Sequence, residues 1–283
     1  MRFPVFYLDV FPHRPHSGNP AAVCILDSWL DDELLRKVAA ENNLSATAFL
    51  VPQGHDYELR WFTRVCELHF CGHATVASAY VVLNLLRPEL TGVRFSTRQR
   101  GILAATKDSG LLAMDFPALF AKVCTNVPEK LFAALGSETR PSEVLEVNQV
   151  YVAVFDSQDV IANLPPNSDL LQQLHPYAVS VTAPGEESDF VSRYFAPGYG
   201  IPEDPVTGSA HCFLTPYWAK RLGKAQLYAR QLSERGGELW CEALGERVIL
   251  KGRAALKLQG ELSIHLSSCP QPAEYIDPSL RSG

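Results

Sequence analysis

The chain has 283 residues, of which 47% are hydrophobic and 20% are charged, a balance typical of a packed globular protein of one or two domains. Its 25 basic and 31 acidic residues give a formal net charge of −6. Without a strong positive field to hold a phosphate backbone, nucleic acid is not expected as a partner.

The apolar stretches are shorter than a bilayer span, and the first ten residues lack the basic start and long apolar run of a secretory signal. We therefore expect a cytoplasmic protein without a membrane partner. The seven cysteines are an odd, scattered number with no Cys-x-x-Cys pair. This usage favours buried free thiols over disulfides.

The first half of the chain alternates strand and helix patterns. Asp31 is a plausible N-cap for a helix over 32–43, and Pro88 stops a second helix over 72–86. Strand patterns cover residues 3–10, 46–51, 57–63, 93–97, 102–107 and 111–116, with turn chemistry at 108–110.

A similar order follows Pro117, which divides the chain into a lobe over 1–117 and a lobe over 118–283. A helix over 209–222 ends at Gly223. Whether the last strand returns to the first lobe is left open, and the tail after Cys269 is expected to be disordered or dispensable. Strand patterns cover 150–155, 178–182, 190–195, 229–233, 238–243, 247–251, 254–259 and 261–266.

The two halves share a local signature. Arg60-Trp61-Phe62 precedes a helix that opens at Gly72, and Arg193-Tyr194-Phe195 precedes a helix that opens at Gly208. The two glycines lie about half the chain apart. This spacing indicates a duplicated domain, although two unrelated strand–loop–helix units would give the same pattern.

Each repeated unit ends in a glycine at a helix start, where free N–H groups and the helix dipole favour a carboxylate or phosphate. A pseudo-two-fold axis would bring both starts to one cleft suited to a small anion. Glu203 and Asp204 add two carboxylates just before the second helix. The alternative is plain N-capping, by Thr207 or Ser209 on the second helix.

The sequence gives weaker support for other kinds of site. Metal-ligand residue types cluster at 66–73, but zinc sites use separated ligand pairs, so no metal is predicted. Asp204, Ser209 and His211 are triad residue types without a G-x-S-x-G elbow, so no hydrolase triad is predicted. Neither glycine-rich nucleotide motif occurs, so no cofactor is predicted.

Several motifs together resemble the PhzF-like (phenazine biosynthesis-like) family, within the diaminopimelate epimerase-like fold. Their order and spacing hold from about Phe3 to Leu262. The matching pieces are Asp9-Val10-Phe11, Gly18-Asn19-Pro20-Ala21-Ala22-Val23, Asn43-Leu44-Ser45, Arg60-Trp61-Phe62-Thr63, Cys71-Gly72-His73-Ala74-Thr75, Glu203-Asp204-Pro205-Val206-Thr207-Gly208-Ser209-Ala210-His211 and Arg235-Gly236-Gly237-Glu238.

The resemblance implies an α/β (α+β) fold of two pseudo-symmetric lobes, each a curved, mostly antiparallel sheet around a central helix. It places the active site in the cleft between the lobes and implies a homodimer. It also implies a cofactor-independent isomerase that moves a proton within a small carboxylic acid. Relatives with this fold are epimerases and racemases.

Carried over position by position, the match nominates catalytic side chains and substrate-binding positions. His73, at a helix start, should hold a proton weakly and act as a neutral donor or acceptor. Asp204 could bind a substrate amine, orient His73 or carry protons. The catalytic candidates are His73, Asp204 and Ser209, and the substrate-binding candidates are the backbone of Gly72 and Gly208 and, in a glycine loop, Asn19.

One departure from the family pattern bears directly on chemistry. The family has Asn-Leu-Ser-Glu-Thr, whose glutamate is the main proton-transfer acid/base, whereas this chain has Asn43-Leu44-Ser45-Ala46-Thr47. The methyl group of Ala46 cannot exchange a proton. Arg64 and His69 also stand where prolines are frequent.

Three hypotheses follow from Ala46. We favour an isomerase or epimerase with an impaired or different acid/base, and Cys71 is a substitute whose thiol pKa a helix start would lower. Cys71 could equally be a small buried residue. The second hypothesis is a catalytically impaired binder of small anions, and the third is an interaction protein whose cleft has no ligand.

Overall fold

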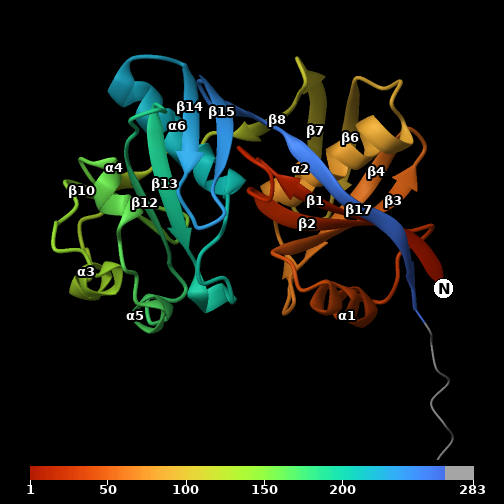
Figure 1. Ribbon diagram of the computed structural model, residues 1–283, viewed down its shortest axis with the longest axis horizontal. Helices are drawn as coiled ribbons and strands as arrows, with labels where there is room; N and C mark the ends of the chain where they lie inside the picture. Colours follow the sequence, from red (N-terminus) through yellow and green to blue (C-terminus); the bar gives the residue numbers. More distant parts are fainter. Residues whose placement is uncertain (265–283) are drawn as a thin grey trace, which may run out of the picture.

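The computed structural model describes residues 1–264, which form two lobes placed side by side (Figure 1). Hydrogen bonds between neighbouring strands link all the strands of this range into one continuous network. None of its helices combines the length and apolar character needed to cross a bilayer. The predictions for Leu266 and for the tail after Cys269 lie outside the described residues.

The first lobe is a curved sheet around a central helix, α2 (Gly72–Tyr80). Residues 72–79 of α2 are all buried, because its small side chains let strands approach from several sides. A π-helix, η1 (Val81–Leu86), continues α2, and α1 (Asp32–Asn42) packs on the outer face of the sheet. The strands are β1 (Arg2–Val10), β2 (Asn19–Ile25), β3 (Ala46–Gln53), β4 (Asp56–Phe62), β5 (Glu67–Leu68), β6 (Gly92–Thr97), β7 (Gly101–Asp108) and β8 (Leu111–Pro117).

The second lobe has the same plan around α6 (Gly208–Leu222), which Gly223 ends in the left-handed conformation. Its other helices are α3 (Glu129–Leu135), α4 (Gln158–Ala162), α5 (Ser168–Gln172) and the 3-10 turn η2 (Pro197–Tyr199). Its strands are β9 (Lys122–Val123), β10 (Glu143–Val147), β11 (Val150–Val154), β12 (Ala178–Pro184), β13 (Phe190–Phe195), β14 (Gln226–Gln231), β15 (Gly237–Leu244) and β16 (Arg247–Gly252).

The strand pairings repeat from one lobe to the other. In the first lobe β2 runs parallel to β3 and β4 runs parallel to β6. In the second lobe β11 runs parallel to β12 and β13 runs parallel to β14. The other pairings between named strands are antiparallel. The structure therefore shows the two pseudo-symmetric, mostly antiparallel lobes that the resemblance implied.

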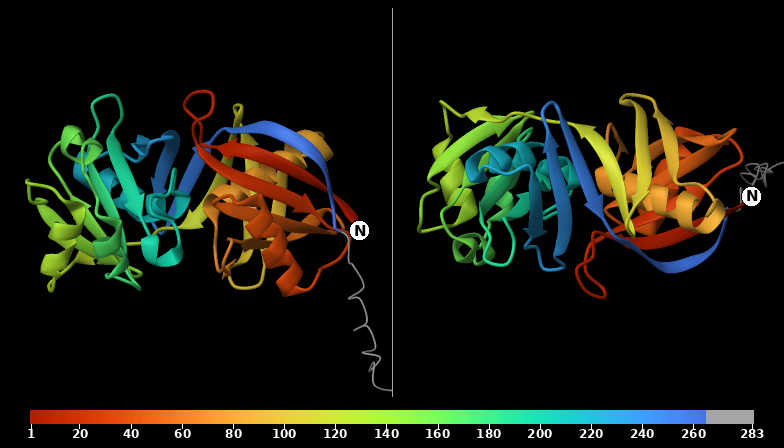
Figure 2. Two further views of the ribbon diagram at one scale, coloured as in Figure 1. Left: turned by 60° about the horizontal axis from the view of Figure 1, so that its bottom comes forward. Right: turned by 90° about the horizontal axis from the view of Figure 1, so that it is seen from above.

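The first lobe receives one of its strands from the second half of the chain. After β8 the chain crosses to β9, which pairs with β10, and after β16 it crosses back to β17 (Ala254–Ser263), which pairs with β1. Figure 2 shows β17 (blue) lying along β1 (red) in the first lobe. Strands β8 and β16 also pair with each other across the junction. The chain thus crosses between the lobes more than once.

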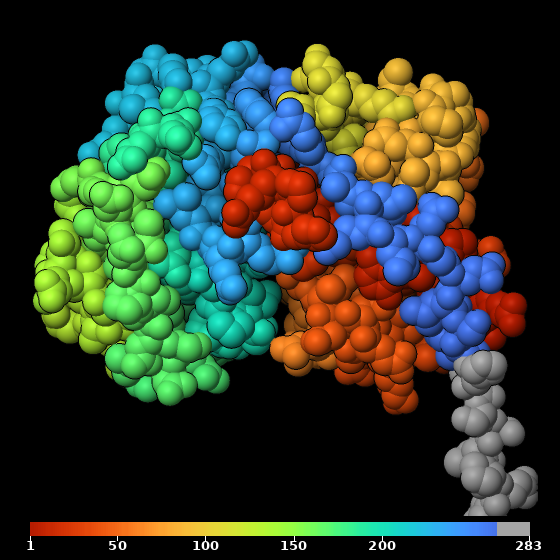
Figure 3. All heavy atoms as spheres, viewed as in Figure 1, coloured from red at the N-terminus to blue at the C-terminus, as the bar shows by residue number. Residues whose placement is uncertain are grey.

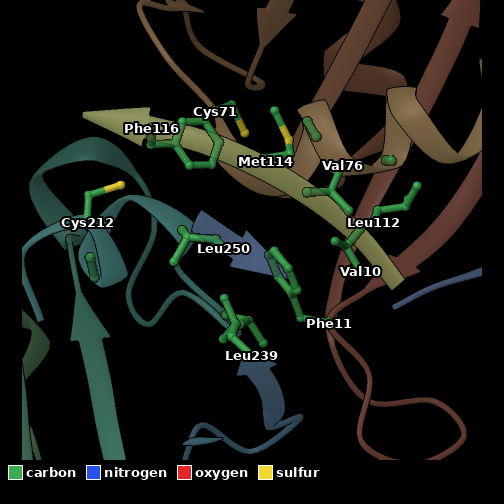
Figure 4. Packing of buried hydrophobic residues seen from close by; sticks show 14 of the residues in the cluster. Val10, Phe11, Cys71, Val76, Leu112, Met114, Phe116, Cys212, Leu239 and Leu250 are labelled. Carbon is green, nitrogen blue, oxygen red and sulfur yellow. The ribbon is translucent and has the colours of Figure 1, made fainter. Parts of the chain in front are cut away.

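One hydrophobic core runs through the junction. Phe11 and Phe116 from the first lobe and Leu239 and Leu250 from the second are buried in the same cluster. Figure 4 shows these side chains packed against one another. Burial of this apolar surface fixes how the lobes sit and hence the shape of the cleft between them.

Four sequence predictions need correction. Asn19 lies in strand β2, where we expected a glycine loop. The sequence patterns predict no helix or strand between Pro117 and Val150, whereas the structure has β9, α3 and β10 there. The last two predicted strands form one strand, β17, within the described residues, and the end of the helix over 72–86 is a π-helix.

Candidate active site

Helices α2 and α6 start at the junction between the lobes and meet end to end. A Cβ atom built on Gly72 would lie 3.6 Å from the Cα of Gly208, and one built on Gly208 would lie 3.6 Å from the Cα of Gly72. The first N–H groups of a helix have no partner within it and carry its positive dipole end. The structure therefore brings together the two anion-binding helix starts that the repeat suggested.

An asparagine links one titratable group of each lobe. Asn19 Nδ2 donates to Asp204 Oδ1 at 2.8 Å and to the Val206 carbonyl at 2.8 Å, and it lies 3.3 Å from His73 Nδ1. His73 and Asp204 are each 7% exposed. The Oδ1 atom of Asn19 is fully buried and has no hydrogen-bond partner, although buried acceptors are usually satisfied.

Asp204 is held by hydrogen bonds that the sequence analysis did not predict. The hydroxyl of Thr207 donates to Asp204 Oδ2 at 2.6 Å. Gln231, at the end of β14, donates to the backbone carbonyl of Asp204 at 2.7 Å and accepts from the Thr207 N–H at 2.8 Å. Burial raises the pKa of Asp204 to about 6, against the hydrogen bonds from Thr207 and Asn19, which lower it.

His73 is neutral at physiological pH, as predicted, but for a different reason. Burial lowers the pKa of His73 to about 4. The sequence argument attributed the low pKa to the helix start. Since the Nδ1 atom lies 3.6 Å from the protonated thiol of Cys71, a hydrogen-bond donor, we assign the ring proton to Nε2.

Of the two alternatives for Cys71, the structure favours the small buried residue over the reactive thiolate. Cys71 is the N-cap of α2 and is 6% exposed, with Sγ 3.6 Å from His73 Nδ1. Burial raises the pKa of Cys71 to about 12, so the thiol keeps its proton at neutral pH. Desolvation outweighs the helix dipole here, and the thiol can act as a hydrogen-bond donor to His73.

Ala46 opens strand β3 and is fully buried. It pairs with Ala21 in the parallel register between β2 and β3. Asn19 lies two residues before Ala21 on β2, and side chains two apart share a face of a strand. The position of the missing carboxylate is therefore on the same sheet face as Asn19.

Equivalent arginine–glutamate ion pairs connect the strand and the loop that precede α2 and α6. Arg193 Nε and Nη2 donate to the two carboxylate oxygens of Glu203 at 2.7 and 2.9 Å. Arg60 binds Glu67 in the same way at 2.7 and 2.6 Å. Each glutamate stands five residues before the glycine that opens its helix. Glu203 is thus engaged by Arg193, and Asp204 alone contributes its carboxylate to the site.

A second set of contacts locks the lobes together beside the site. Arg235 donates to Asp9 Oδ1 at 2.7 Å and to the Gly18 carbonyl at 2.8 Å. The N–H of Gly18 donates to the Gly236 carbonyl at 2.7 Å. Figure 3 shows the N-terminal segment (red) lying over the junction beside the blue C-terminal half. These contacts explain why the motifs at 9–11, 18–23 and 235–238 occur together.

A cavity of about 270 Å³ lies between the lobes. On one wall it includes Ser45, which precedes Ala46, and on the other it includes Glu203 and Pro205, which flank Asp204. It therefore opens next to the polar cluster. Its lining is formed by Asn43, Leu44, Ser45, Thr63, Arg64, Val65, Tyr199, Gly200, Ile201, Pro202, Glu203 and Pro205.

The remaining residues considered in the sequence analysis, Ser209 and His211, do not join the cluster of Asn19, His73 and Asp204. His211 Nδ1 donates to the Thr207 carbonyl at 2.8 Å, so Asp204, Ser209 and His211 do not form a triad. Ser209 is partly exposed at the second position of α6. Among residues 1–264, no group of three or more His, Cys, Asp or Glu side chains is arranged to hold a metal ion.

Comparison with known proteins agrees with this architecture. The family described as phenazine biosynthesis-like protein matches residues 8–260. A Pseudomonas aeruginosa protein named as an uncharacterized isomerase is 47% identical over 264 residues, which cover 93% of this chain and 100% of that protein.

Solved structures extend the likeness to the fold. A PhzF-family phenazine biosynthesis protein from Enterococcus faecalis has a TM-score of 0.87 and 40% identity, covering 93% of this chain and 100% of that one. A hydroxyproline epimerase from Agrobacterium vitis shares the fold alone, with a TM-score of 0.63 and 9% identity over 92% of each chain. On its family match and its relatives, the chain belongs to the phenazine biosynthesis-like (PhzC-PhzF) family.

Proposed function

We propose that the chain is an isomerase or epimerase that moves a proton within a small carboxylic acid bound between the lobes, without a cofactor. One observation carries this proposal. His73 and Asp204, joined through Asn19, lie where two helix starts meet. Two titratable groups whose surroundings move their pKa values in opposite directions are typical of acid/base catalysis.

The geometry supports a division of roles. Asp204, with a pKa of about 6, is ionised at neutral pH yet basic enough to accept a proton. His73 carries its proton on Nε2 and can donate it. The free N–H groups at Gly72 and Gly208 would bind the substrate carboxylate and stabilise the charge that develops when the neighbouring carbon loses its proton.

The second candidate function is a catalytically impaired binder of small carboxylates. It is favoured by Ala46, a buried methyl group where the family pattern has its acid/base, and by the protonated thiol of Cys71. The anion-binding helix starts do not depend on either residue. Binding would therefore persist where turnover is slow or absent.

Solvent deuterium uptake into a panel of small carboxylic acids, followed by NMR, separates these functions. The native protein is compared with Ala46→Glu, Cys71→Ala and Asp204→Asn. Asp115→Asn is the matched control, since Asp115 is a half-exposed carboxylate that pairs with Arg247, and neither residue lines the cavity. Binding of the same acids is measured by calorimetry.

An isomerase gives uptake in the native protein that is lost in Asp204→Asn and kept in Asp115→Asn. Loss of uptake in Cys71→Ala would assign a proton-transfer role to the thiol. Uptake that appears only in Ala46→Glu would show that the native protein is a catalytically impaired binder and that a carboxylate at this position restores turnover. If the native protein and Ala46→Glu both bind an acid but neither shows uptake, the proposal of an isomerase is overturned. If neither binds any acid, the hypothesis of an interaction protein remains.

A further inference from the structure

The cavity between the lobes is lined by one charged group that has no opposite charge beside it among residues 1–264. Of the residues that line it, only Arg64 and Glu203 are charged. Glu203 is bound through both oxygens by Arg193. The guanidinium of Arg64 is therefore the net charge that the cavity wall presents to a ligand.

Arg64 is exposed and has no anionic partner in the part of the chain that the structure describes. Its Nη1 donates to Asn43 Oδ1 at 3.2 Å, and within residues 1–264 no carboxylate lies at ion-pair distance. Asn43 is itself fixed, because it caps α1 in the left-handed conformation with its N–H on the Ala39 carbonyl. By contrast, Arg60, four residues earlier, binds two carboxylates.

The region between the lobes thus has two separate places that attract negative charge. The starts of α2 and α6 offer N–H groups where the two helices meet, and Arg64 offers the N–H groups of its guanidinium in the lining of the cavity. One of the five N–H groups of Arg64 is used by Asn43, which leaves a pair for bidentate recognition of a carboxylate. A monocarboxylic acid could use only one of the two places.

We infer that the ligand is a small carboxylic acid with a second anionic group, and that Arg64 binds this second group. The inference rests on the proposed function, because it takes the first carboxylate to lie at the helix starts. It names Arg64 as a specificity-determining residue, since the guanidinium selects among acids without taking part in proton transfer.

Calorimetry with straight-chain acids tests the inference directly. The dicarboxylates from succinate to pimelate are compared with monocarboxylates of the same chain length, on the native protein, Arg64→Gln and Arg36→Gln. Arg36 is the matched control, because it is exposed on α1, bonds a backbone carbonyl and does not line the cavity. Phosphonate analogues show whether the second anion must be a carboxylate.

We expect one dicarboxylate length to bind about 10-fold more tightly than its monocarboxylate, as a charge-assisted pair would give. Arg64→Gln should remove that preference and leave monocarboxylate binding unchanged, while Arg36→Gln keeps it. Equal binding of both acid types to the native protein, or a preference that survives Arg64→Gln, overturns the inference and leaves the proposed function standing. Failure of every acid to bind overturns both.

Discussion

Replacing Asp204 by asparagine should stabilise the protein at neutral pH while it removes the carboxylate that the proposed function needs. Burial raises the pKa of Asp204 from its ordinary 3.8 to about 6. The folded protein therefore holds this proton after the unfolded chain has released it. Stability falls as pH rises through this window, and the full loss is reached above the folded pKa.

The size of the effect follows from the two pKa values. A rise from 3.8 to about 6, at roughly 1.4 kcal/mol per pH unit, makes the ionised Asp204 cost about 3 kcal/mol of folding free energy. An amide at this position keeps an acceptor for Asn19 but loses the bond from the Thr207 hydroxyl, which costs about 1 kcal/mol. The variant should gain about 2 kcal/mol above the folded pKa and lose about 1 kcal/mol below pH 4.

Urea titrations of both proteins, from about pH 4 to about pH 8, measure the difference in unfolding free energy. We expect that difference to change sign across the range, whereas Asp115→Asn, on the surface, should show no such change. A difference that stays constant with pH, or an Asp204→Asn variant less stable than the native protein at high pH, would refute the reasoning.

Three further outcomes test the surroundings of the site. Iodoacetamide at neutral pH should label exposed Cys66 and spare Cys71, whose pKa burial raises to about 12, and equal labelling would contradict this assignment. Gly208→Ala should change stability by less than about 1 kcal/mol yet abolish acid binding, and retained binding would place the acid elsewhere. Arg193→Met should cost roughly 3–5 kcal/mol in urea unfolding. Glu203→Gln should cost less, since Arg193 keeps its bonds to two backbone carbonyls, and equal losses would show that these bonds contribute nothing.

Long and strongly patterned elements could be predicted from the sequence. The starts of α2 and α6 are marked by a glycine followed by small or polar residues, and the end of α6 by Gly223. The sequence patterns do not predict β2, because Gly18-Asn19-Pro20 is typical of a turn, although β2 pairs with neighbours on both sides. Helices such as α4, five residues long, carry too little periodicity to be detected.

The same distinction between local and tertiary signals applies to the residues of the candidate site. His73, Asp204 and Asn19 belong to motifs and were nominated from the sequence. Gln231 carries no local signal, because its role depends on β14 ending beside Asp204. The pKa of Cys71 was predicted in the wrong direction because burial, a tertiary property, outweighs the helix dipole that the sequence position suggests.

The central claim is that a small carboxylic acid binds between the lobes where α2 and α6 meet. A crystal structure of the protein with its tightest-binding acid tests this most directly. We predict a carboxylate on the N–H groups at Gly72 and Gly208, with the neighbouring carbon within reach of His73. The same acid bound at another surface, with the two helix starts unoccupied, would contradict the account.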